Sequence, residues 1–258
     1  MKKQRLISIG IHLTPYQDFI NNLVTLSSQG SSYTCFANVH MLVECHKDPG
    51  FAKIVNNADM VAPDGMPLTW GLQLIHGVKQ DRVTGMDALP HLLATAEEKD
   101  IPVYFYGGTD DMLRKTKSYI RQYHPQLQLA GMYSPPFRKL TAEEDQEVVD
   151  AINASGAKFV FVALGCPKQE KWMASMKGRI NACMIGIGGA LPVMIGMQSR
   201  APEWMQKVSM EWLYRFMQEP KRLFKRYLVT NSTFMWLMLK AWIQKGRGRM
   251  LYPAQEAV

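Results

Sequence analysis

The chain has 258 residues, of which 47% are hydrophobic, 20% are charged, 19 are glycine and 14 are proline. These proportions lie near the average for globular proteins, so they exclude a disordered chain, a collagen-like repeat and a small disulfide scaffold. The net charge of +8 is concentrated at one end, because residues 200–249 hold eleven lysines and arginines against three acidic residues. A near-neutral body therefore precedes a basic tail.

Apolar runs of strand-like composition alternate with helix-period segments along the first 200 residues. The predicted strands are Leu6–Ile11, Tyr33–Ala37, Met60–Ala62, Val103–Tyr106, Leu127–Met132, Phe159–Leu164 and Cys183–Ile187. Between them the helical pattern covers residues 15–28, 41–57, 66–76, 86–99, 110–123, 141–155 and 168–178. This alternation predicts an α/β fold, a Rossmann-like and mainly parallel sheet with helices on both faces. We expect this domain to span residues 1–199 and a helical, basic appendage to span residues 200–258.

The helix predicted at residues 141–155 has the clearest start signal. Thr141-Ala-Glu-Glu144 is a capping box, and Gly156 stands where this helix should end. Glu143 and Asp145 fall in its first turn, where acidic side chains stabilise the helix dipole. We therefore interpret these two carboxylates as structural.

Several predicted strands end in turns that contain glycine. In open parallel sheets ligands bind beyond the carboxyl ends of the strands, and glycine there lets a ligand approach the backbone. The segments that follow the strands include Asn38–His40, Pro63–Gly65, Gly107–Asp110, Gly165–Glu170 and Gly186–Gly189. The pattern suits a nucleotide or nucleotide sugar, although tight turns favour glycine for structural reasons too. The sequence has no GxGxxG fingerprint, no P-loop and no Asp-x-Asp pair, so we expect neither a metal nor a cofactor.

Three polar positions near these strand ends each allow two interpretations. Asp64, in Pro-Asp-Gly, is either a turn residue or a carboxylate that accepts a proton from an attacking hydroxyl. Arg82 and Asp87 also allow two interpretations. Either they belong to a surface loop and a helix cap, or Arg82 binds a phosphate or a sugar. Gln169 and Glu170 either open a helix or face a ligand.

The tail interleaves cationic and aromatic residues. Arg222 and Arg226 are four residues apart and are neighbours on one helical face, and Arg215 precedes them. This is either a solvated basic face or an interfacial helix with cations toward anionic headgroups and Trp, Phe and Leu toward acyl chains. The apolar content favours a membrane surface over nucleic acid, and residues 228–243 carry too many polar interruptions to span a bilayer. With no secretory signal and four scattered cysteines, we expect a cytoplasmic protein, peripheral at the inner face of the plasma membrane, with reduced thiols.

From about residue 9 to residue 227 the chain resembles the WecG/TagA/CpsF family of bacterial glycosyltransferases, and seven segments carry the resemblance. They are Asn38-Val-His-Met, Asn57-Ala-Asp-Met-Val-Ala-Pro-Asp-Gly65, Arg82-Val-Thr-Gly-Met-Asp87, Tyr106-Gly-Gly108, Ala163-Leu-Gly-Cys-Pro-Lys-Gln-Glu-Lys-Trp172, Arg200-Ala-Pro-Glu-Trp204 and Glu211-Trp-Leu-Tyr-Arg-Phe-Met-Gln-Glu-Pro-Lys-Arg222. The resemblance implies inverting transfer of a sugar from a UDP-sugar to a polyprenyl-diphosphate-linked sugar in surface polysaccharide synthesis, without a metal. The sugar would be of the N-acetylmannosamine type.

The resemblance also implies roles for individual residues. It makes Asp64 the leading candidate for the catalytic base. It places substrate-binding residues at Asn38, Arg82 and Gln169, to which we add the strand-end glycines Gly108 and Gly188. It implies that tail arginines close over the site at the membrane, namely Arg215, Arg222 and Arg226. Removing the tail should then abolish transfer and leave the body folded.

Two positions depart from the family pattern. Phe36-Ala-Asn38 stands where many members have Thr-Pro-Asn, and Pro192 stands where many have Asp. Both changes leave the donor sugar open, with glucose as an alternative. Relatives are suggested to form oligomers through the body, and a homo-oligomer of this chain stays open. Two other functions also stay open from the residues alone: another nucleotide-dependent enzyme on the same sheet, and a non-enzymatic membrane-binding protein.

Overall fold

A computed structural model describes residues 2–207 and 209–246, except for the side chains of Lys207 and Arg222. Its strands are β1 (Lys3–Leu6), β2 (Ile9–His12), β3 (Ser32–Ala37), β4 (Met60–Pro63), β5 (Val103–Gly107), β6 (Leu129–Tyr133), β7 (Phe159–Ala163) and β8 (Cys183–Gly186). The helices of the body are α1 (Tyr16–Ser28), α2 (Val39–Lys47), α3 (Pro49–Asn56), α4 (Met66–His76), α5 (Gly85–Glu98), α6 (Asp110–Tyr123), α7 (Ala142–Ala154), α8 (Lys168–Met176) and α9 (Ala190–Met194). Those that follow are α10 (Glu203–Lys207), α11 (Glu211–Gln218) and α12 (Pro220–Gly246).

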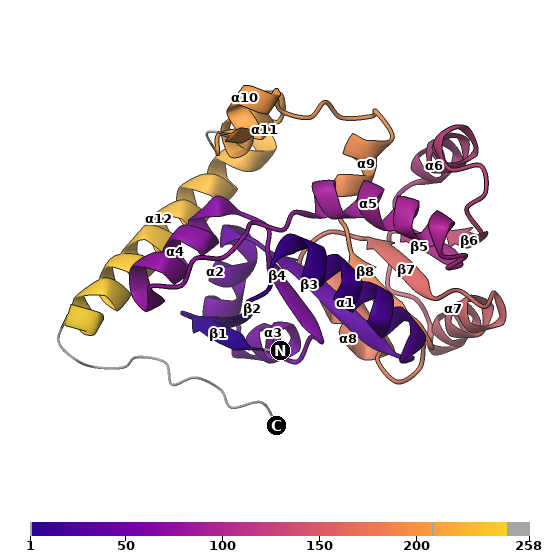
Figure 1. Ribbon diagram of the computed structural model, residues 1–258, viewed down its shortest axis with the longest axis horizontal. Helices are drawn as coiled ribbons and strands as arrows, with labels where there is room; N and C mark the ends of the chain where they lie inside the picture. Colours follow the sequence, from indigo (N-terminus) through magenta and orange to yellow (C-terminus); the bar gives the residue numbers. More distant parts are fainter. Residues whose placement is uncertain (1, 208, 247–258) are drawn as a thin grey trace.

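Six strands form one parallel sheet in the order β4-β3-β8-β7-β5-β6. Alternate side chains of a strand point to opposite faces, so each face builds its own core. In β7, Val160 and Val162 join one buried cluster, whereas Phe159 and Phe161 join the other. Residues of α2, α3, α7 and α8 complete the first cluster, and residues of α1, α5, α6 and α9 complete the second. The predicted Rossmann-like fold is confirmed (Figure 1).

The N-terminal strand prediction is wrong in its topology. Instead of one strand over residues 6–11, β1 and β2 form an antiparallel hairpin outside the main sheet. Ile7 in the connecting turn has φ 57°, a left-handed conformation that is rare outside glycine. The apolar run Leu6–Ile11 hides this reversal because residues on both sides of the turn are buried.

The helix predicted over residues 41–57 is two helices. Asp48 ends α2 and caps α3, where its side chain accepts a hydrogen bond from Phe51 N at 3.1 Å. Pro49 then occupies the first turn of α3, where a proline has no backbone N–H to leave unpaired. By contrast, the capping box at Thr141 and Glu144 is confirmed, with hydrogen bonds in both directions.

Up to residue 246, the described part of the basic tail folds as three helices, and the longest of them packs on the body. One face of α12 is buried against α2 and α4, through Leu223, Phe234 and Leu237 among others. Figure 1 shows α12 running beside these two helices, with α10 and α11 at its N-terminal end. Within the described ranges, no helix is both long and apolar enough to cross a membrane. Residues 247–258 of the expected appendage lie outside the described residues.

Candidate active site at the carboxyl edge of the sheet

Five of the candidate residues follow five neighbouring strands at one edge of the sheet. Along the order β4-β3-β8-β7-β5, the residues that follow are Asp64, Asn38, Gly188, Gln169 and Gly108. The carboxyl ends of parallel strands meet at the same edge, which is where open α/β sheets bind ligands. The strand order therefore collects residues that lie far apart in the sequence.

Asp64 is held by backbone and side-chain hydrogen bonds. Its N–H donates to Ala37 O at 2.8 Å, and its Oδ1 accepts from Gly85 N at 3.2 Å. The side chain of Asn38 also lies close enough to the Asp64 carboxylate to act to lower its pKa. Because Asn38 Oδ1 accepts from Met41 N at 3.1 Å as the N-cap of α2, its amide NH₂ is the group that faces Asp64.

Burial sets the acidity of this carboxyl. It raises the pKa of Asp64 above its ordinary value, and the Gly85 N–H partly offsets that effect. The positive charges of Arg215 and Arg82 also act to lower the pKa of Asp64. A carboxylate whose pKa is raised toward the working pH is a better proton acceptor than an ordinary surface aspartate.

Arg215 reaches the body from α11. Its Nη2 lies 2.7 Å from the point that a Cβ on Gly189 would occupy, so a side chain at position 189 would require the guanidinium to shift. Gly189 directly follows Gly188 in the turn after β8. The structure therefore brings Arg215 to the same sheet edge as Asp64.

Gln169 is buried, with 5% of its surface exposed. Its Oε1 accepts from Gly165 N at 3.1 Å, and its Nε2 donates to Glu170 Oε1 at 2.8 Å. The amide also lies against Gly186 and Gly188, where an added Cβ would come within 2.9 and 3.1 Å of it. Gln169 thus joins the ends of β7 and β8, and one Nε2 hydrogen is left for a ligand.

Glu170 follows Gln169 in α8 and is fully buried. Burial raises the pKa of Glu170, and its Oε2 meets no hydrogen-bond donor within normal distance among the residues described. The helix-start interpretation of this segment is confirmed, since Glu170 lies in the first turn of α8.

Arg226 lies on α12 near the start of α2. Burial and the charge of Arg226 lower the pKa of His40, which is in the first turn of α2. Arg226 Nε is buried without a hydrogen-bond partner in the described part of the chain. Arg222 is in the first turn of α12, and its side chain lies outside the described residues.

Gly108 is set apart from the other candidates. It has φ +77°, its N–H donates to Ala163 O at 3.0 Å, and Ser134 Oγ donates to its carbonyl at 2.9 Å. These contacts tie it to the ends of β6 and β7. The structure thus gives Gly108 a turn role, four strands along from Asp64.

The two positions that depart from the family pattern lie beside the site. Phe36 is buried and contacts the Phe19 ring, at 5.8 Å between centroids, and lies under Gly85. Pro192 is partly exposed in α9, and its carbonyl accepts from Met197 N at 2.9 Å. Phe36 therefore extends the core up to the backbone that holds Asp64.

At the junction with the tail, Glu211 and Arg200 had no predicted role, and Asp87 was predicted only as a helix cap. Arg82 Nη1 donates to Glu211 Oε2 at 2.5 Å, and Arg200 Nη2 donates to Asp87 Oδ1. Although burial raises it, hydrogen bonds from Arg200 and Thr84 hold the pKa of Asp87 below its ordinary value. Thr84, not Asp87, is the N-cap of α5. Glu211, Asp87 and Arg200 all lie in the segments that carry the family resemblance, which was the available signal.

The described side chains contain no cluster of three His, Cys, Asp or Glu residues that could hold a metal ion. The cations around Asp64 are arginines of the chain itself. A carboxylate next to arginine side chains is an arrangement that can transfer a proton and bind negative charge.

Comparisons of the whole sequence relate the chain to known proteins. The family model described as "Glycosyl transferase WecG/TagA/CpsF family" matches residues 4–248. A protein of Bacillus spizizenii named N-acetylglucosaminyldiphosphoundecaprenol N-acetyl-beta-D-mannosaminyltransferase is 31% identical over 207 residues, which cover 79% of each chain. A protein of Bacillus subtilis with the same name is 31% identical over 183 residues, covering 70% of this chain and 69% of the relative.

Proposed function

The chain belongs to the WecG/TagA/CpsF family of glycosyltransferases, and on that premise we propose that it moves a sugar from a UDP-sugar to a polyprenyl-diphosphate-linked sugar in surface polysaccharide synthesis. The two relatives are named for transfer of N-acetyl-β-D-mannosamine to N-acetylglucosaminyldiphosphoundecaprenol. The donor sugar of this chain is of the N-acetylmannosamine type, with a glucose-type sugar as the alternative. The observation that carries the proposal is Asp64, a half-buried carboxylate at the carboxyl edge of the sheet, with Arg215 and Arg82 close enough to lower its pKa.

Asp64 acts as the general base in a single inverting displacement. It takes the proton of the acceptor hydroxyl as that oxygen attacks the anomeric carbon from the face opposite UDP. The bond between the anomeric carbon and the phosphate oxygen breaks, and its electron pair leaves with UDP. General-base catalysis by a positioned side chain contributes typically about 10²–10⁴-fold to the rate.

Arginines and helix N-termini stabilise the leaving UDP in place of a metal. Arg215 contributes from α11, with Arg226 and Arg222 from α12. The backbone N–H groups at the start of α2 and α8 add partial positive charge at the same edge of the sheet. Asn38 holds Asp64 in position, and Arg82, Gln169 and Gly188 contact the donor, whereas Gly108 keeps the turn after β5 in shape.

A membrane surface holds the lipid-linked acceptor near this site. The outward face of α12 exposes large apolar side chains, including Leu228, Trp236 and Trp242, next to Lys221 and Lys225. Interfacial helices combine these residue types in this way. We place the chain at the inner face of the plasma membrane, with its appendage against anionic lipid.

A transfer assay in EDTA tests the reaction. A panel of UDP-sugars is offered with a short-chain polyprenyl-diphosphate-sugar acceptor to the intact chain and to Asp64→Asn. We expect lipid-linked product from one donor and a loss of about 10²–10⁴-fold in kcat for the variant. Full activity of Asp64→Asn would remove Asp64 as the base, and a strict need for a divalent cation would remove the metal-free mechanism.

A further inference from the structure

Four charged side chains form a continuous set of contacts across the junction between body and tail. Arg82, in the loop before α5, donates to Glu211 Oε2 of α11 at 2.5 Å. Arg82 Nη2 also lies 3.9 Å from Asp87 Oδ2, and Arg200 donates to the other oxygen of Asp87. Each side chain of the Arg82–Glu211 pair is 19% exposed, so this is a partly buried pair rather than a surface one.

The cleft on the Glu211 side of this pair is too small for a diphosphate. It is lined by Arg200, Glu211 and Arg215, together with Met86 of α5 and Val193 of α9. Its volume is about 10 Å³, which is room for about one water molecule. A diphosphate group is several times larger than a water, so this cleft must widen to hold one, and a shift of α11 away from the body would widen it.

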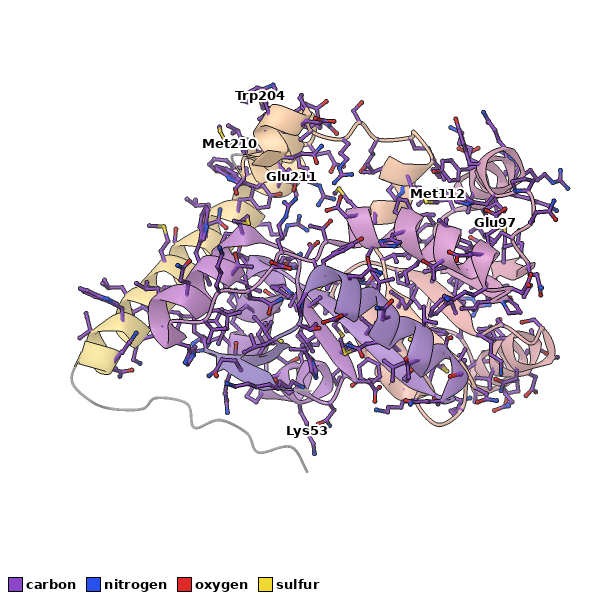
Figure 2. All side chains as sticks on the ribbon, viewed as in Figure 1. Lys53, Glu97, Met112, Trp204, Met210 and Glu211 are labelled. Carbon is purple, nitrogen blue, oxygen red and sulfur yellow. The ribbon has the colours of Figure 1, made fainter. Side chains whose placement is uncertain are left out.

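Glu211 and Arg215 move together if α11 shifts. They are four residues apart in α11 and therefore lie on one face of that helix. Glu211 contacts Arg82 and Arg215 covers Gly189, so both contacts of α11 with the site lie on this face. Figure 2 shows Glu211 where α11 meets the body, whereas Trp204 lies at the outer end of the tail.

We propose that Glu211 occupies, on Arg82, the place that the donor's diphosphate takes, so that donor binding breaks the Arg82–Glu211 pair and shifts α11. This inference rests on the proposed function for the identity of the ligand. A phosphate carries more negative charge than a carboxylate and binds guanidinium with the same two-pronged geometry. The incoming diphosphate can therefore displace Glu211, and the freed Arg215 can follow the charge that develops on the leaving group.

Removing the charge of Glu211 distinguishes this role from a purely structural one, because the two roles predict opposite changes in the affinity for UDP. If the pair only fastened the tail, removing the Glu211 charge would weaken UDP binding or leave it unchanged. If Glu211 competes with the diphosphate, removing its charge must tighten UDP binding. A partly buried pair of this kind is worth up to about a tenfold change in a dissociation constant.

Calorimetric titration of the full-length chain with UDP measures that sign. We expect Glu211→Gln to bind UDP about 3- to 10-fold more tightly than the unsubstituted chain. The matched control is Glu203→Gln, which removes the same charge from an exposed side chain of α10 and should leave the affinity unchanged. Equal or weaker binding by Glu211→Gln overturns the inference. If neither the unsubstituted chain nor Glu211→Gln binds UDP, the proposed donor itself is wrong, and this inference fails with it.

A second measurement needs no change at Glu211. Trp212 adjoins Glu211 in α11 and is about half exposed, so a shift of α11 should alter its fluorescence as UDP binds. We expect a UDP-dependent change in emission with a midpoint at the calorimetric Kd, and its loss in Trp212→Phe. Emission that does not respond to bound UDP, or a response that Trp212→Phe retains in full, contradicts the shift.

Discussion

The body and the tail bury their apolar side chains to different extents. In β7 of the body, Phe159, Val160 and Phe161 are all fully buried between the two helical layers. In α12 of the tail, Phe234 faces the body and is 8% exposed, whereas the next aromatic residue, Trp236, is 58% exposed. Most of the exposed large apolar side chains among the described residues lie beyond residue 200. The apolar side chains of the body are buried in its own core. The tail has one apolar face that packs on the body and a second apolar face that stays exposed.

The largest difference between the two faces of α12 should appear in stability. Phe234→Ala leaves a cavity against the core of the body, and such changes cost about 3–5 kcal/mol. Trp236→Ala, two residues away, should change the free energy of unfolding by no more than about 0.5 kcal/mol. Urea unfolding of both variants measures this contrast. Equal losses would mean that α12 does not have one buried and one exposed face.

In membrane binding the ranking of these two variants should be reversed, with the larger loss caused by Trp236→Ala. Trp236→Ala removes an aromatic side chain from the outward face and should weaken sedimentation with anionic vesicles by roughly tenfold. Phe234→Ala should change it less, at temperatures where that variant stays folded. Vesicle binding that Trp236→Ala leaves intact would contradict the lipid-facing role of this surface.

The smallest expected effect lies within the body and concerns pH. The raised pKa of Asp64 means that the protonated, inactive form persists to a higher pH than for an ordinary aspartate, so kcat/KM should fall as pH decreases through that raised pKa. Asn38→Ser keeps a helix cap for α2 but loses the side-chain amide beside Asp64. Because that amide acts to lower the pKa of Asp64, its loss should move the acid limb of the profile to higher pH, by at most about one pH unit.

A pH–rate profile of both proteins measures the shift. Asn21→Ala, in an exposed part of α1, serves as the control and should leave the profile in place. An acid limb that stays fixed in Asn38→Ser, or that moves to lower pH, would contradict the contact between Asn38 and Asp64.

The sequence predicts the body well because its signals are local. Continuous apolar runs indicate the strands and period-3.6 patterns indicate the helices. Because parallel strands bring their carboxyl ends to one edge, Asp64, Asn38 and Gln169 could be grouped from the sequence alone. The hairpin at Ile7 was missed because an apolar run does not reveal a reversal of direction. The break between α2 and α3 was missed although Asp48-Pro49 is a recognisable helix start.

The junction could not be predicted in the same way. Glu211 and Arg82 are 129 residues apart, and nothing in either local pattern says that they meet. Their contact depends on how α12 packs on α2 and α4, which follows from burial of Leu223, Phe234 and Leu237 rather than from any motif. That packing is also why single substitutions test the tail better than its removal, since truncation would uncover the apolar side chains of α2 and α4.

The central claim is that the tail completes the site of the body, and Arg215 tests it most directly. The measurement is the transfer rate of Arg215→Ala with a short-chain acceptor that needs no membrane, beside Lys225→Ala, which removes an exposed cation from α12. We expect Arg215→Ala to lose about 10²-fold in kcat while its unfolding midpoint is unchanged, and Lys225→Ala to retain full activity. Full turnover by a folded Arg215→Ala would show that the body works without the tail, and would contradict the account.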